Sequence, residues 1–217
     1  MTNYNKRYIK YWNFASGIFS DINWTNFRKI FTGKSYDLTY YERKKIKTYC
    51  ADNYYIILIN RKSHFTTYAL GLLAFLKTGK WPTYSHALMN VDSESKVINW
   101  KKFKFMEATI KGVNWVGFNK VFNCDKVCLL KPKNVSLEEW DSVMTKLLTQ
   151  RHKKYDTLFD LSDDTRVSCV ELVRIALKAV DDYEKKFYHF ENMIESVGNL
   201  TPQMFRDCED FEVFYET

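Results

Sequence analysis

The sequence contains few residues that break regular structure. Only 7 glycines and 3 prolines occur among 217 residues, and neither an internal repeat nor a low-complexity tract is visible. Hydrophobic residues make up 46% of the chain, which is enough to bury a substantial core at this length. The composition therefore excludes long flexible linkers and predicts a soluble globular domain.

Long apolar runs are also missing. The longest nearly apolar stretch, residues 68–76, is far shorter than the roughly 20 residues that a membrane-spanning helix needs. No continuous apolar segment follows the first residues, as it does in a cleavable secretion signal. We therefore expect no transmembrane segment and no signal peptide, and a location in the cytoplasm of the producing cell or in a phage particle.

Cysteine and histidine occur without the spacing of a metal site. The 5 cysteines include no C-x-x-C pair, and the 4 histidines are scattered along the chain. Reduced thiols are expected rather than a disulfide framework. We expect neither a metal nor another cofactor.

The net charge of +7 lies at one end of the sequence. Residues 1–50 contain 10 basic and 3 acidic residues, whereas the remainder contains 23 of each. Aromatic residues alternate with basic ones over residues 1–38, a pattern that can bind single-stranded nucleic acid. No nucleic-acid-binding module is recognisable, so we favour a helical cover on the domain or a docking surface for an acidic protein partner. The acidic residues 207–212 could pair with it.

Periodicity and turn signals predict an α+β fold in which an antiparallel sheet packs against a cysteine-bearing helix. Helices are expected at residues 5–31, 40–51, 65–78, 136–151, 168–183 and 202–206. Strands are expected at residues 54–60, 84–91, 96–99, 103–109, 112–117 and 125–131.

A single thiol, Cys169, opens the helix predicted at residue 168. Ser168 followed three residues later by Glu171 forms a capping-box pattern, which makes Cys169 the first helical residue. The partial positive charge at a helix N-terminus favours thiolate and lowers the pKa of the thiol. Cys169 is therefore a candidate nucleophile. It also begins an apolar stripe with Leu172 and Val173, and this helix on its own favours a buried packing cysteine.

His86 is the candidate base. It lies near the start of the strand predicted at residues 84–91, and Glu107 shares one face of a later strand with Phe105. A carboxylate on an apolar face needs a partner. Glu107 bonded to one ring nitrogen of His86 leaves the other nitrogen free to accept the proton of Cys169. Taken singly, His86 and Glu107 are better explained as a satisfied core histidine and a strand-end carboxylate that reaches water. A catalytic arrangement needs the sulfur within about 4 Å of the ring.

Several short motifs follow one another in an order that resembles a known family. They are Thr39-x-x-Glu42 before the strand at residues 54–61, Ser85-His86, Glu107-Ala108 before Gly112-Val113, Tyr155-Asp156 before Phe159 and Asp160, Cys169-Val170-Glu171-Leu172-Val173, and Thr201-Pro202. This order resembles the circularly permuted papain-like hydrolases of the NlpC superfamily, in particular the YiiX-like branch. The resemblance covers residues 39–217 and leaves residues 1–38 as a basic, aromatic extension that we expect to be helical. Val170 departs from the serine typical of the family.

The resemblance implies a cysteine hydrolase with Cys169, His86 and Glu107 as its catalytic residues. Cys169 forms a thioester, His86 transfers protons, and Glu107 orients the imidazole. The substrate class it implies is an amide in a peptidoglycan-type peptide. A lipid acyl hydrolase or acyltransferase on the same scaffold stays open, as does a non-catalytic binding protein such as a virion component. The abundance of Asn, Lys, Tyr, Phe and Ile suits an AT-rich genome such as that of a phage.

Overall fold

The computed structural model describes residues 29, 30, 34, 36–62, 72, 75, 79–91, 104–156, 165–197 and 200–217. The helices are α3 (Tyr40–Asp52), α5 (Phe118–Val121), α6 (Leu137–Thr149), α7 (Cys169–Leu177), α8 (Tyr183–Lys186), α9 (Tyr188–Val197) and α10 (Pro202–Asp207). The strands are β1 (Ile56–Asn60), β2 (His86–Asn90), β3 (Lys104–Thr109), β4 (Gly112–Gly117), β5 (Lys126–Pro132) and β6 (Phe211–Glu216).

These strands form a sheet with the spatial order β4-β3-β2-β1-β5-β6. Each neighbouring pair is antiparallel, with Leu58 opposite Ala87 on one side of β1 and opposite Cys128 on the other. β1 and β2 therefore lie near the middle of the sheet. The architecture is α+β with an antiparallel sheet, as the sequence predicts.

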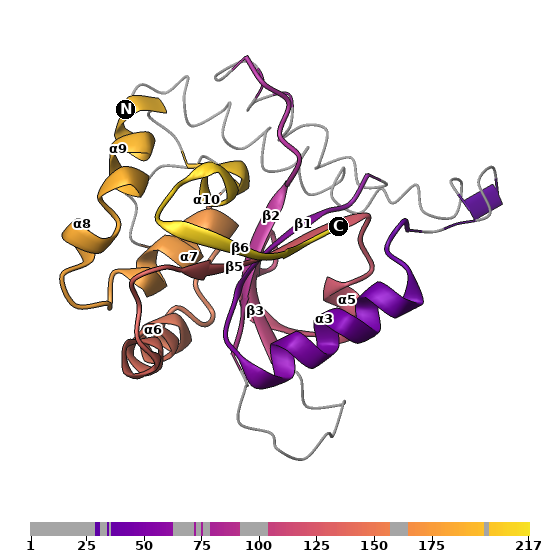
Figure 1. Ribbon diagram of the computed structural model, residues 1–217, viewed down its shortest axis with the longest axis horizontal. Coiled ribbons are helices and arrows are strands. Elements are labelled where there is room, and N and C mark those ends of the chain that lie inside the picture. Colours follow the sequence, from indigo (N-terminus) through magenta and orange to yellow (C-terminus); the bar gives the residue numbers. More distant parts are fainter. Residues whose placement is uncertain are drawn as a thin grey trace.

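Helices cover both faces of the sheet (Figure 1). One core cluster joins Ile56, Leu58 and Met89 to α6, α7, α9 and α10, and a second joins Ile57, Ile59 and residues of β5 to α3 and α5. Successive residues of a strand point to opposite faces, so a continuous apolar run such as β1 needs a core on each side.

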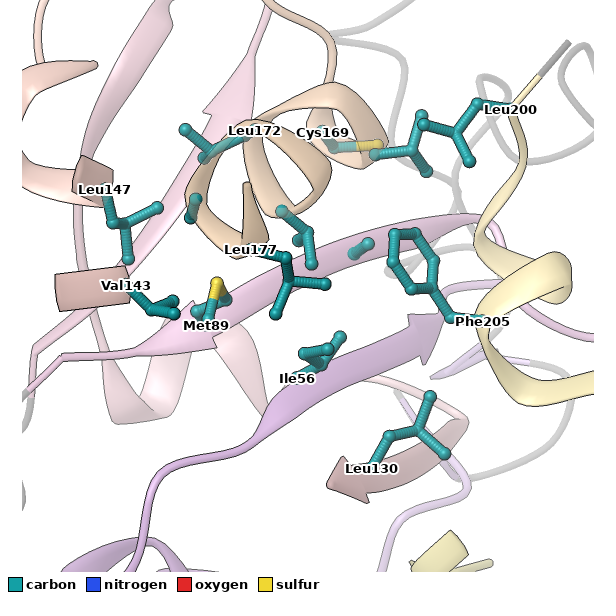
Figure 2. Packing of buried hydrophobic residues seen from close by; sticks show 14 of the residues in the cluster. Ile56, Met89, Leu130, Val143, Leu147, Cys169, Leu172, Leu177, Leu200 and Phe205 are labelled. Carbon is teal, nitrogen blue, oxygen red and sulfur yellow. The ribbon is translucent and has the colours of Figure 1, made fainter. Parts of the chain in front are cut away.

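Figure 2 shows the first of these clusters. Leu177 of α7 lies over Ile56 and Met89, and Leu172 and Cys169 belong to the same cluster. Burying aliphatic side chains of this size stabilises the fold by about 1.5–3 kcal/mol each. The cysteine-bearing helix is thus fixed to the sheet by apolar packing, as expected.

The turn between β3 and β4 requires a glycine at Gly112, because a side chain there would collide with the backbone of a neighbouring segment. Its φ is +88°, and a Cβ at this position would approach the carbonyl oxygen of Lys153 to 2.6 Å. The N–H of Val113 donates to this same oxygen at 3.0 Å. Glycine allows the segment after α6 to lie against the turn.

A buried amide ties α3 to the sheet. The side-chain oxygen of Asn90 accepts from the N–H of Tyr55 at 2.6 Å, and its amide nitrogen donates to the carbonyls of Cys50 at 3.2 Å and Asn53 at 2.7 Å. Asn90 therefore satisfies backbone groups where the chain leaves α3 and enters β1.

Most expected elements that fall on described residues are confirmed, namely the five strands now labelled β1–β5 and the helices now labelled α3, α6 and α10. The strand at residues 96–99, the helix at residues 5–31 apart from residues 29 and 30, and most of the helix at residues 65–78 lie outside the described residues.

The helix expected at residues 168–183 is wrong at its end. α7 stops at Leu177, and Asp182 adopts a positive φ of 53°, a conformation that an α-helix interior does not allow. Val180 nevertheless stays buried, because the turn after α7 keeps it against the core.

Four further elements, α5, α8, α9 and β6, are not among those predicted from the sequence. The end of the chain, interpreted there as an acidic segment, is an edge strand that pairs with β5. Three consecutive side chains are exposed along this edge, those of Glu212, Val213 and Phe214. This strand therefore lacks the alternation of buried apolar and exposed polar residues from which a half-buried strand is predicted.

We predict that Asn90→Ala lowers the free energy of unfolding by about 2–4 kcal/mol, because it leaves buried backbone groups without partners. Chemical denaturation monitored by circular dichroism measures the change. Asn114→Ala is the matched control, since Asn114 is exposed and donates to the carbonyl of Lys111 within the same turn. It should change stability by less than about 0.5 kcal/mol. Equal effects of the two substitutions would contradict the role of Asn90.

Candidate functional site

Cys169 is the first residue of α7, and the capping box that predicts this position is confirmed. The N–H of Glu171 donates to the Ser168 hydroxyl at 3.3 Å, and the N–H of Ser168 donates to the Glu171 carboxylate at 2.7 Å. α7 packs on β2 and β3. The cap therefore sets the start of the helix, and the packing brings that start to the sheet.

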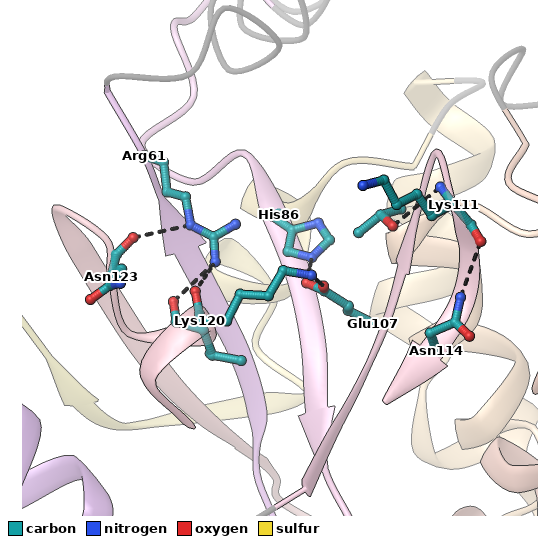
Figure 3. Close-up of polar contacts among 9 residues, drawn as sticks. Arg61, His86, Glu107, Lys111, Asn114, Lys120 and Asn123 are labelled. Carbon is teal, nitrogen blue, oxygen red and sulfur yellow. Dashed lines mark hydrogen bonds and ion pairs between the residues drawn. The ribbon is translucent and has the colours of Figure 1, made fainter. Parts of the chain in front are cut away.

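His86 and Glu107 meet at the beginning of β2. His86 is the first residue of β2, and its Nε2 lies 3.0 Å from Oε2 of Glu107 in β3 (Figure 3). β2 and β3 pair through Met89 and Asn90, at the end of β2 remote from His86. The Glu107 side chain is 4% exposed and the His86 side chain 16%, so the contact is largely shielded from solvent.

Lys120 holds the second oxygen of the same carboxylate. Its Nζ lies 3.0 Å from Oε1 of Glu107, and its side chain is 69% exposed (Figure 3). Glu107 thus bridges a lysine of α5 and the histidine of β2. No pattern in the sequence identified Lys120.

The charges of this group shift the pKa values of its members. Burial disfavours the ionised carboxylate of Glu107, but His86 and Lys120 outweigh it and lower the pKa to about 2. Burial also disfavours the imidazolium of His86, yet its interactions with Cys169 and Glu107 raise the pKa to about 9. Glu107 is therefore charged and His86 is protonated at neutral pH.

Cys169 interacts directly with His86, and the interaction favours thiolate. Burial alone raises the pKa of the thiol, but the charge and hydrogen bonding of His86 and the N–H groups of Ala87 and Val170 bring it below its usual range. Because Glu107 occupies Nε2 of His86, Nδ1 is the nitrogen left for the thiol. The Val170 donor belongs to the start of α7, whereas the Ala87 donor comes from β2.

Tyr155 is a further neighbour of the sulfur. Burial raises the pKa of the phenol, and its hydrogen bond to Cys169 and the charge of the thiolate raise it further, so Tyr155 stays protonated and donates. The segment before it is held by the turn at Gly112, through the contact of Lys153 with Val113.

The structure thus brings Cys169, His86 and Glu107 together and adds Lys120, Ala87 and Tyr155 to the group. Their catalytic roles stay predictions. Cys169 is also 2% exposed and belongs to the first core cluster. Its surroundings are therefore also those of a buried packing cysteine.

We compared the chain with known proteins. Neither a family model nor a curated relative matches it. Among solved structures it is similar to the crystal structure of the metalloprotein YiiX from Escherichia coli O157:H7, with a TM-score of 0.54 over 77% of this chain and 98% of that one. The chain has a YiiX-like fold. At 16% sequence identity, the similarity to YiiX concerns the fold alone.

The description of YiiX as a metalloprotein prompts the question whether this chain offers metal ligands. Among its described residues, no group of three or more His, Cys, Asp or Glu side chains could hold a metal ion. In the candidate site, Glu107 gives one oxygen to His86 and the other to the ammonium of Lys120. Two cationic partners on one carboxylate do not fit a resident metal there.

Within the part of the chain that the structure describes, no helix has the length and hydrophobicity that spanning a membrane requires.

We predict that Cys169 is alkylated first when the folded protein is treated with iodoacetamide near pH 6, because only thiolate reacts at a useful rate. Peptide mass spectrometry measures the order of modification. Burial raises the pKa of the other cysteines, to about 12 for Cys124, Cys128 and Cys208 and still higher for Cys50. Faster modification of any of these four would remove the physical support for an activated Cys169.

Proposed function

We propose that the chain is a cysteine hydrolase that cleaves an amide through a thioester on Cys169. The observation that supports this most is the linked group of Cys169, His86 and Glu107, in which the thiol pKa is lowered and the imidazole pKa is raised to about 9. A thiolate beside an imidazolium supplies a nucleophile and a proton donor at the same pH.

In the first half of the proposed reaction, the thiolate of Cys169 attacks the carbonyl carbon of the amide. The carbonyl oxygen becomes an oxyanion, which backbone N–H groups at the start of α7 stabilise. The imidazolium of His86 then gives its proton to the leaving nitrogen. The carbon–nitrogen bond breaks, and the amine leaves while the acyl group stays on the sulfur as a thioester.

In the second half, the neutral imidazole of His86 accepts a proton from water as the water attacks the thioester. The carbon–sulfur bond breaks, the acid is released, and the thiolate–imidazolium pair is restored. Glu107 keeps the ring oriented throughout, since its oxygen stays on Nε2 and only Nδ1 exchanges protons with the reactants.

For the substrate we propose an amide of a peptidoglycan-type peptide. This follows from the resemblance to the NlpC superfamily, whose circularly permuted papain-like arrangement we infer for this chain as well. The YiiX-like fold and the order of His86, Glu107 and Cys169 along the chain support that inference. The two other functions, cleavage of a lipid acyl bond and a binding role in a virus particle, are outcomes of the experiment that follows.

We predict that purified peptidoglycan releases new amino groups when treated with the protein and that Cys169→Ser lowers the rate by several orders of magnitude. Serine keeps the size of the side chain but is a far weaker nucleophile. Amine release and mass spectrometry of the products measure the reaction. Cleavage of a phospholipid panel in place of peptidoglycan would favour the lipid hydrolase. Absence of both activities, or full activity of Cys169→Ser, would contradict the proposal.

Ser168→Ala is the matched control at the neighbouring position. Losing the helix cap should lower the free energy of unfolding by about 1 kcal/mol, whereas activity should fall only as far as the start of α7 shifts. Cys169→Ser should leave the melting temperature nearly unchanged. Unfolding of Cys169→Ser would instead indicate a packing residue.

The pH profile provides an independent prediction. We expect kcat/KM to fall above about pH 9, because His86 loses the proton that the leaving amine needs. The measurement is kcat/KM on a soluble peptide fragment across the pH range in which the fold is stable. Glu107→Gln removes the negative charge beside His86 and should move this basic limb to lower pH. A wild-type limb near the ordinary histidine pKa of about 6.5 would contradict the thiolate–imidazolium pair.

A further inference from the structure

The two oxygens of the buried Glu107 carboxylate have different partners. Oε2 lies 3.0 Å from Nε2 of His86, and Oε1 lies 3.0 Å from Nζ of Lys120. A carboxylate can rotate about its terminal bond, since torsions of this kind have broad minima. The contact with Lys120 fixes that rotation and keeps Oε2 directed at the ring.

The position of Lys120 is itself determined by two neighbours. Arg61, which follows β1, donates to the carbonyl oxygens of Lys120 at 2.7 Å, Val121 at 3.1 Å and Asn123 at 3.1 Å (Figure 3). Phe118, at the other end of α5, packs into the second core cluster. The backbone of Lys120 is therefore held from both sides even though its side chain is mostly exposed.

We propose that Lys120 is a positioning residue of the site, which keeps Glu107 oriented toward His86 and thereby supports the thiolate of Cys169. This inference rests on the proposed function, because it assumes that the thiolate is the reacting group. It adds α5 to the elements that build the site. Lys120 acts through Glu107 and His86 and is not assigned a contact with substrate.

An ordinary surface ion pair would behave differently. Removing an exposed lysine from such a pair changes little, because solvent screens the interaction. Lys120 faces a carboxylate that is 4% exposed, so the contact is shielded from solvent on the side of Glu107. Loss of Lys120 therefore frees a carboxylate oxygen inside the site, so that Glu107 no longer holds the ring of His86 in the orientation that supports the thiolate of Cys169.

The test is the pH profile of Cys169 alkylation by iodoacetamide in the full chain. We expect Lys120→Met to move the midpoint of the profile to higher pH by about 0.5–1 unit and to slow alkylation near pH 6 by about three- to tenfold. Lys120→Arg keeps a cation on Glu107 and should restore the rate to within about twofold. Circular dichroism establishes that each variant is folded.

Lys111→Met is the matched control for the loss of charge. Lys111 is an exposed lysine in the turn between β3 and β4, where its backbone carbonyl accepts from Asn114 and its N–H donates to the Thr109 hydroxyl. This variant should alkylate at the wild-type rate. An equal effect of Lys111→Met and Lys120→Met would overturn the inference, since a general change in charge would then explain both.

The same experiment separates the inference from the proposed function. If wild-type Cys169 is alkylated selectively but Lys120→Met has an unchanged profile, Lys120 is not a positioning residue and the proposed function stands. If another cysteine of the wild type reacts first, the activated thiol and the role of Lys120 are both wrong.

Discussion

The buried charge of Glu107 determines the ionic state of the whole site. An ionised carboxylate inside a protein is unfavourable unless cations and hydrogen bonds compensate it. Here an imidazole compensates one oxygen and an ammonium the other. Cys169 and this carboxylate together raise the pKa of His86, and the imidazolium in turn favours the thiolate of Cys169. The ionisation of the Cys169 sulfur thus depends on Glu107, which acts through His86 and need not contact the sulfur.

The two faces of the sheet contribute different parts of this group. α7 lies in the first core cluster and brings the thiol, whereas α5 lies in the second and brings the lysine. His86, at the start of β2, connects the two, because it interacts with Cys169 and also contacts Glu107, the partner of Lys120. The double covering of the sheet therefore assembles the site as well as the core.

Local signals in the sequence predicted much of this arrangement. The Ser168–Glu171 spacing located the start of α7, and apolar runs located the central strands, because caps and strands depend on neighbouring residues. The contact of Glu107 with His86 was inferred from a carboxylate on an apolar face. Lys120 and the N–H of Ala87 could not be found in this way, because their contacts depend on which elements meet in the folded protein. An exposed lysine leaves no pattern in the sequence, and a backbone donor leaves none at all.

Burial does not decide whether Cys169 is a packing residue or a nucleophile. Cys169 is as buried as Cys50 and Cys124, and all three belong to apolar clusters. Burial raises the pKa of Cys50 and Cys124, as expected for a thiol among apolar groups. The pKa of Cys169 moves in the opposite direction, because His86 and two backbone N–H groups face its sulfur. A cysteine can therefore fill space in a core and still be ionised. What distinguishes Cys169 is the set of donors at the start of α7 and β2.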